Sequence, residues 1–94
     1  MEEKMDIQTK YFKNGKLRLI PRKEKNKLEV LNYFNQVLMA QEKESFSEKE
    51  VNAIIGDIYD DYAIIRRYLV DYGYLLRDDY GRLYQINKKM MDQD

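Results

Sequence analysis

A change in the spacing of hydrophobic residues at Gly73 constrains the fold more than any other feature of this sequence. Before Gly73, apolar residues recur every three or four positions, as in Val51, Ile54, Ile55 and Ile58, which is the period of an amphipathic helix. Beyond Gly73 the period falls to two, as in a strand. A helix that ends at a glycine and leads directly into a strand pattern predicts an α+β domain.

A separate helix is predicted before the one that ends at Gly73, and it has the clearest start signal in the chain. Ser47 is followed three residues later by Glu50, the spacing of a capping box, while Phe46 and Val51 occupy the two positions of a hydrophobic staple. We expect this helix over about residues 48–57.

Two further helices are predicted on either side of it. Pro21 suits the first turn of a helix because its missing N–H needs no partner there, and a core-facing helix is expected over about residues 22–41. The helix that ends at Gly73 starts with Asp60 or Asp61 as its cap. Its apolar side is expected to consist of Tyr62, Ile65, Leu69 and Tyr72.

Two β-hairpins are predicted at the ends of the helical region. Asn14 and Gly15 readily take the positive φ angles of a tight turn, which indicates a hairpin over residues 10–20. A second hairpin is expected from the alternating strands 74–77 and 82–86, joined by a four-residue loop.

The predicted architecture is an α+β, winged helix-turn-helix-like fold. It has an N-terminal β-hairpin, three helices and a C-terminal β-hairpin that would form the wing. We expect one domain over residues 9–87, a flexible N-terminus at 1–8 and a flexible tail at 88–94.

Composition excludes most enzyme chemistry. The chain has no Cys and no His, which removes thiolate metal sites, Cys nucleophiles and the usual general base. It contains no phosphate-binding loop and no dinucleotide fingerprint, so we expect neither an enzyme nor a cofactor. Asp57, Asp60 and Asp61 lack the ligand spacing of a calcium loop, and helix capping or repulsion of unwanted partners is expected of them rather than metal binding.

The expected location is the cytoplasm, without a membrane partner. The longest apolar runs have only a few residues, and no charged-then-apolar leader opens the chain.

Charge is strongly segregated along the chain although the total is zero, with 17 basic and 17 acidic residues. Residues 10–27 hold eight Lys or Arg against one Glu, a net charge of +7, whereas residues 42–61 have a net charge of −5. Such segregation predicts two surfaces of opposite potential, which could bind a partner, a nucleic acid or each other within the fold.

Several of these segments closely resemble the bacterial domain-of-unknown-function 2087 family, over roughly residues 12–86. The resemblance is carried by residues 47–52, residues 61–73, the run Asn14-Gly15-Lys16-Leu17 before Ile20-Pro21, and Tyr84. It implies a winged-helix-like domain, found alone or as the C-terminal part of transcriptional regulators. In the longer members a separate helix-turn-helix precedes the domain, so the resemblance leaves open whether the domain itself contacts DNA. The family pattern often has Leu and Trp where this chain has Ile65 and Tyr84, and neither change threatens the fold.

The preferred hypothesis is a DNA-binding transcriptional regulator whose third helix reads the major groove. Arg67 is the candidate for a base contact, with Arg66 at the margin of the same face. Candidate phosphate contacts are Lys16, Arg18, Arg22, Lys23, Arg77 and Arg82. The three carboxylates near the start of this helix argue against the hypothesis, because they would repel phosphates.

Both arginines also have a structural interpretation, in which they connect and orient the helices. Arg66 would then pair with Asp61 or Asp57, and Arg67 with Asp71 four residues on.

The alternative hypothesis is a protein-interaction module that does not bind DNA directly, a homodimer included. Its candidate interface comprises Ala63, Val70 and Tyr80, although we expect the first hairpin to cover Ala63 and Val70. Among the nine tyrosines, Tyr62, Tyr68, Tyr72 and Tyr84 are expected in the core, whereas Tyr59, Tyr74 and Tyr80 are expected to be freer.

Overall fold

The computed structural model describes residues 11–80 and 82–91. The N-terminus at 1–8, which we expect to be flexible, lies outside these residues, as do Lys10 and positions 92–94. In chain order the described elements are β1 (Phe12–Lys13), β2 (Lys16–Leu17), α2 (Glu24–Met39), β3 (Ser45–Ser47), α3 (Glu48–Gly56), α4 (Tyr62–Asp71), β4 (Leu75–Arg77), β5 (Leu83–Ile86) and α5 (Lys88–Met91).

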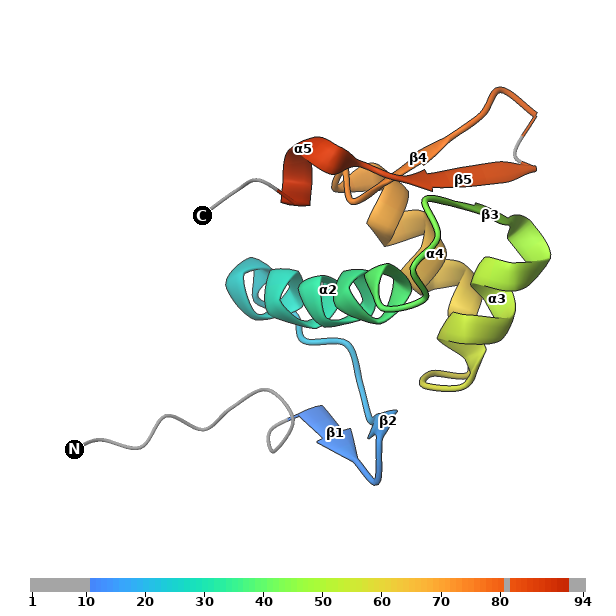
Figure 1. The fold of residues 1–94 in the computed structure, drawn as a ribbon. Coiled ribbons are helices and arrows are strands. Elements are labelled where there is room, and N and C mark those ends of the chain that lie inside the picture. The colour runs from blue at the N-terminus through green and yellow to red at the C-terminus, as the bar shows by residue number, and fades with distance from the viewer. Residues whose placement is uncertain (1–10, 81, 92–94) are drawn as a thin grey trace.

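The helices α2, α3 and α4 pack together, and a three-stranded antiparallel sheet lies beside them (Figure 1). The strand order is β3-β5-β4, so the strand that precedes α3 pairs with the second strand of the C-terminal hairpin, with Phe46 opposite Tyr84. Three helices followed by this hairpin form a winged-helix-like α+β arrangement, as the sequence predicts.

The predicted start of α3 is confirmed. The Ser47 hydroxyl accepts a hydrogen bond from Glu50 N at 3.1 Å, and Ser47 N donates to the Glu50 carboxylate at 2.8 Å. The staple residues Phe46 and Val51 are both buried. Hydrogen bonds from the Lys43 ammonium and from Ser47 N hold the pKa of the Glu50 carboxyl below its ordinary value. The capping box thereby fixes the junction of β3 and α3.

Both ends of α4 agree with the sequence signals. Asp61 is the cap, and its carboxylate accepts a hydrogen bond from Ile64 N at 3.4 Å. The chain leaves the helix through Gly73, whose φ of +87° is a left-handed conformation that a side chain would strain. The direct passage from α4 into β4 therefore depends on glycine at this position.

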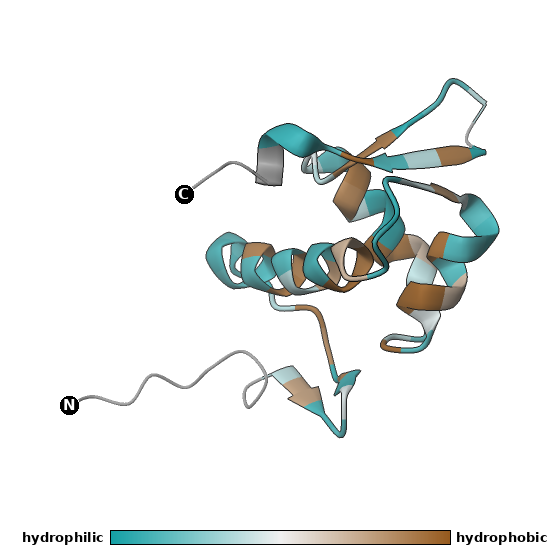
Figure 2. Ribbon diagram, in the orientation of Figure 1, coloured by the Kyte–Doolittle hydropathy of each residue, from teal (hydrophilic) through white to brown (hydrophobic). Residues whose placement is uncertain are grey.

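The core runs between the helices and the inner face of the sheet, and Figure 2 shows hydrophobic residues recurring along α2, α3 and α4. Its largest fully buried side chains include Phe34, Phe46 and Tyr84. Two tyrosine predictions are wrong. Tyr62 is exposed because it lies in the first turn of α4, beyond the core, whereas Tyr74 is buried because the turn at Gly73 directs it inward.

The first hairpin is shorter than predicted but has the expected turn. Phe12 pairs with Leu17, and Asn14 and Gly15 have φ angles of 55° and 79°. Leu17 N donates to Ile58 O at 2.8 Å, which attaches the hairpin to the α3–α4 turn. Phe12 and Leu17 are buried, so this hairpin belongs to the core as well as to the surface.

Four other features differ from the predicted elements. Pro21 is buried but lies before the Lys23 N-cap of α2, outside the first helical turn. The strand β3 is not predicted by the sequence, and the loop of the second hairpin has five residues rather than four. The structure also contains the short helix α5 at Lys88–Met91, within the predicted flexible tail.

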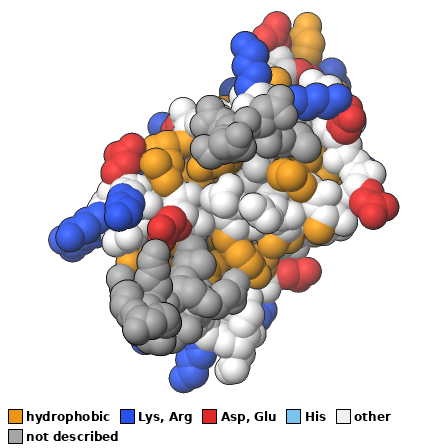
Figure 3. All heavy atoms as spheres, turned by 60° about the vertical axis from the view of Figure 1, so that its left-hand side comes forward, with side chains coloured by type: hydrophobic (Ala, Val, Ile, Leu, Met, Phe, Trp, Pro, Cys, Tyr) orange, Lys and Arg blue, Asp and Glu red, His pale blue; other side chains and the backbone are white. Residues whose placement is uncertain are grey.

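The surface mixes small apolar patches with charged groups. On the face shown in Figure 3, hydrophobic side chains lie in several separate patches, and Lys, Arg, Asp and Glu side chains project from the periphery. No helix in the described part of the chain is long and apolar enough to cross a membrane.

Candidate nucleic-acid interface

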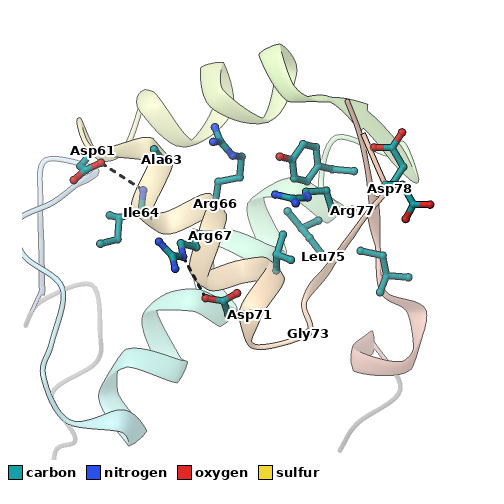
Figure 4. Close-up of a pocket in the computed structure, with 14 residues that line it drawn as sticks. Asp61, Ala63, Ile64, Arg66, Arg67, Asp71, Gly73, Leu75, Arg77 and Asp78 are labelled. Atoms are coloured by element: carbon teal, nitrogen blue, oxygen red, sulfur yellow. Dashed lines mark hydrogen bonds and ion pairs between the residues drawn. The ribbon is translucent and has the colours of Figure 1, made fainter. Parts of the chain in front are cut away.

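A groove lies between the outward face of α4 and the β4–β5 hairpin, where the DNA hypothesis places base contacts (Figure 4). Its volume is about 1020 Å³. The helix contributes Asp61, Ala63, Ile64, Arg66, Arg67, Val70 and Asp71, and the region from Gly73 onward contributes Gly73, Leu75, Leu76, Arg77, Asp78, Asp79 and Tyr84.

Arg66 is directed away from the centre of the groove, toward α3 (Figure 4). Its guanidinium donates to the Asn52 side-chain oxygen and lies 3.5 Å from the Glu48 carboxylate. Only 20% of its side chain is exposed. The predicted ion pair of Arg66 with Asp61 or Asp57 is therefore wrong. The partners are on α3, because the packing of α3 against α4 brings one turn of α3 to Arg66.

Arg67 is the most available arginine of α4. Its side chain is 80% exposed and lies 3.7 Å from the Asp71 carboxylate, which confirms the predicted ion pair. A pair this exposed is weak, about 0.3–0.5 kcal/mol at i, i+4 spacing. Arg67 is held loosely beside the groove.

Two further arginines come from the second hairpin. Arg77 reaches from β4 toward α4 (Figure 4). The Arg82 guanidinium lies over the Tyr80 ring, 5.2 Å from its centre, and Tyr80 is 77% exposed. Tyr80 is thus as free as the sequence predicts, with a cation on its face.

Charges of both signs line the groove. Three arginines are opposed by four aspartates, at positions 61, 71, 78 and 79. Asp61 lies at the N-terminal end of α4, the end that a recognition helix presents to DNA. The Asp78 carboxylate accepts hydrogen bonds from the backbone N–H groups of Arg82 and Leu83. The groove therefore offers no surplus of positive charge to a duplex.

Contrary to our expectation, the first hairpin does not cover Ala63 and Val70. Ala63 is exposed, and Val70 is half-buried against the core. Both line the groove, whereas none of the described residues 11–27 does so. The first hairpin is attached instead at the α3–α4 turn and to Tyr33 of α2, whose ring centre lies 4.6 Å from that of Phe12.

The basic residues of the first hairpin and the start of α2 form a separate surface, which we call the basic segment (residues 11–27). It contains seven Lys or Arg and one acidic residue, Glu24. The Lys16 ammonium donates to Asp57 O at 3.0 Å, and the Lys27 ammonium lies 4.7 Å from the centre of the Tyr68 ring. The candidate contacts Arg18, Arg22 and Lys23 are exposed here.

All the predicted nucleic-acid-binding residues except Arg82 therefore fall into two groups. Figure 1 shows the first hairpin and the β4–β5 hairpin on opposite sides of the helices. Arg66, Arg67 and Arg77 line the groove, whereas Lys16, Arg18, Arg22 and Lys23 lie in the basic segment. A single groove does not bring all of them together.

Sequence reasoning missed the two α3 residues that hold Arg66. Glu48 and Asn52 are four positions apart, so they share one face of a helix. That spacing is a usable signal for a common partner, but only the packing of α3 on α4 identifies Arg66 as the partner.

The fold is that of a winged-helix-like domain of α+β class. The chain belongs to the bacterial family described as "Uncharacterized protein conserved in bacteria (DUF2087)", whose model matches residues 16–86. No curated protein and no solved structure matches the chain.

Proposed function

We propose that this protein binds duplex DNA and acts in bacterial transcription regulation, with the basic segment as its principal DNA contact. One observation carries the proposal: the four ion pairs among the described residues all use cations outside residues 11–27. Among the described residues no carboxylate pairs with a cation of the basic segment, so its exposed cations are available to a polyanion. Phosphates of a duplex, at one charge per about 1.7 Å, suit such a surface.

A protein partner is the second candidate, and the groove supports it. Ala63 is exposed there beside half-buried Val70, and the lining charges of both signs resemble those of a protein surface more than a phosphate-binding one. The partner could be another chain or a second copy of this one. An Ala63→Lys variant is expected to weaken that contact without affecting the basic segment.

The test measures binding to a labelled pool of random duplex DNA by fluorescence anisotropy, in titrations from low to near-physiological salt. A DNA-binding protein is expected to show a non-specific dissociation constant of about 10⁻⁴–10⁻⁶ M at physiological salt, with affinity that falls steeply as salt rises. Absence of binding at low salt would reject the proposal. Sedimentation of the wild type and Ala63→Lys would then test self-association through the groove.

A further inference from the structure

We infer that the protein holds DNA through phosphates alone, by the basic segment, and that α4 does not read bases. Binding is then independent of sequence, although the fold is winged-helix-like. This inference rests on the proposed function and specifies its mode. Phosphate contacts carry no direct sequence information, whereas base contacts in the grooves do.

The arginines of α4 are poorly suited to base recognition. Arg66 is committed to α3 through Glu48 and Asn52, and its side chain is mostly buried. Arg67 is exposed but has Asp71 beside it on the same helix. A bidentate guanine contact needs a guanidinium that presents two free N–H groups to the base edge. Arg66 would have to leave its partners on α3 to do so, and the charge of Arg67 is offset by Asp71 beside it.

The approach of a duplex to α4 is also opposed by charge. A recognition helix normally directs its N-terminal residues to the base edges. In this chain Asp57, Asp60 and Asp61 are all exposed next to that end of α4. Carboxylates so close to the phosphates would repel the duplex, and salt screens such exposed charges only beyond about 10 Å at 0.1 M.

The β4–β5 hairpin does not compensate for this repulsion. Arg77 and Arg82 are matched in its loop region by Asp78 and Asp79, so the hairpin contributes no net positive charge there. Arg82 in addition stacks on Tyr80. The wing therefore lacks the charge surplus that would hold a phosphate backbone.

The basic segment, in contrast, is both charged and fixed in place. Buried Phe12 and Leu17 attach it to the core, and Leu17 N and the Lys16 ammonium donate hydrogen bonds to the α3–α4 turn. These contacts hold the first hairpin against the α3–α4 turn without DNA. Ordering a free arm on binding would instead reduce the affinity, because the conformational entropy is lost at that moment.

Five cations of the basic segment are exposed and make no side-chain hydrogen bond, ion pair or ring contact with any residue that the structure describes. They are Lys13, Arg18, Arg22, Lys23 and Lys25. If each neutralises one phosphate, the plot of log affinity against log salt has a slope near −4.5. Such a slope corresponds to a loss of affinity of about 500-fold between 50 and 200 mM salt.

The experiment compares two variants with the same change in charge. The first, Arg18→Gln/Arg22→Gln/Lys25→Gln, removes three cations of the basic segment, and the second, Arg67→Gln/Arg77→Gln/Arg82→Gln, removes three from α4 and the wing. All six side chains are exposed, so thermal unfolding is expected to confirm that both variants fold. Anisotropy with random duplex DNA should show a slope about three units shallower for the first variant and an unchanged slope for the second.

Repeated selection from the random pool should enrich no sequence motif. An enriched motif that disappears with Arg67→Gln, or a larger effect of the second variant, would overturn the inference while leaving DNA binding intact. Tighter binding to phosphatidylserine vesicles than to DNA would overturn it in favour of a lipid surface. Failure to bind DNA at low salt would reject the proposed function itself.

Discussion

Asn35 is a polar side chain in the apolar interior of the protein. It lies on α2 and is only 3% exposed. Its amide nitrogen lies 3.5 Å from the Met39 sulfur, but its side-chain oxygen accepts no hydrogen bond from any described residue. A buried polar atom without a partner destabilises the folded state by about 1–3 kcal/mol. Asn35→Leu, which is nearly isosteric, should therefore raise the free energy of unfolding by about 1–3 kcal/mol in urea titrations.

The matched control for this variant is Asn32→Leu, on the exposed face of the same helix. It should change the free energy of unfolding by no more than about 0.5 kcal/mol, as is usual for surface positions. A destabilised Asn35→Leu protein would mean that the Asn35 oxygen has a partner, such as a buried water.

Tyr74 gives the protein a predictable response to alkaline pH. It is 8% exposed, and burial raises the pKa of its hydroxyl above the ordinary value of about 10. Because the folded-state pKa is the higher one, the contribution of Tyr74 to stability is complete below about pH 10. It is lost as pH rises from there through the folded-state pKa.

Urea titrations between pH 9 and 11 should therefore show a steeper fall in the free energy of unfolding for the wild type than for Tyr74→Phe. The difference isolates Tyr74 from the other tyrosines and the lysines, which titrate in both proteins. Parallel curves for the two proteins would show that Tyr74 ionises alike in the folded and unfolded states.

Among the elements, α3 and α4 are joined by a polar contact as well as by the core. Arg66 connects them through Glu48 and Asn52, whereas Arg67 pairs only within α4. Arg66→Met should reduce the free energy of unfolding by about 1–2 kcal/mol, since hydrogen bonds to charged groups are worth about 1.5–3 kcal/mol and this one is partly exposed. Arg67→Met should reduce it by less than about 0.5 kcal/mol.

Chemical denaturation of the two variants tests this difference directly. Equal effects would mean that the contact of Arg66 with α3 contributes no more than a surface ion pair. A double variant with Asn52→Ala should be less than additive if Arg66 acts through Asn52, because residues in one hydrogen-bond network are coupled.

Local chemistry explains which elements could be predicted from the sequence. The capping box at Ser47, the cap at Asp61 and the glycine at position 73 each act within a few residues, and all three appear in the structure where they were expected. The strand β3 has no such signal. It has three residues, two of them serines, and exists because Phe46 pairs with Tyr84 almost forty positions away.

The candidate site was less predictable because it depends on distances between elements. Helical spacing correctly pairs Arg67 with Asp71, since both lie on α4. The same reasoning assigns Arg66 to the nearest aspartates in sequence, but the angle between α3 and α4 brings Glu48 and Asn52 instead. Nor does sequence separation show that the basic segment lies at the α3–α4 turn rather than over Ala63.

At the scale of the whole molecule, the positively and negatively charged segments of the chain are attached to each other at the α3–α4 turn. The basic segment meets the acidic residues 42–61 at the α3–α4 turn, where the Lys16 ammonium and Leu17 N donate hydrogen bonds to the carbonyl oxygens of Asp57 and Ile58. These contacts use backbone carbonyls rather than carboxylates. No described carboxylate forms an ion pair with a cation of the basic segment, although exposed Asp57 lies beside Lys16.

The attachment of the first hairpin to the core depends on the buried side chain of Leu17. The stability of the hairpin and the proposed DNA affinity therefore depend on it as well. Leu17 is 5% exposed, whereas Leu19, two positions on, is 51% exposed. Leu17→Ala should destabilise the contact of the hairpin with the core by about 2–5 kcal/mol. Hydrogen exchange should then show loss of protection at the amides of residues 17 and 18, while protection within α2 and α4 persists.

Leu19→Ala is the control and should leave both amides protected. Because neither variant removes a cation, the proposed function predicts weaker DNA binding for Leu17→Ala alone, through loss of the ordered platform. If Leu17→Ala exposes the amides of the hairpin and of the helices to the same extent, the first hairpin unfolds only with the whole domain. The basic segment would then be as rigid as the core, and its affinity for DNA would follow global stability.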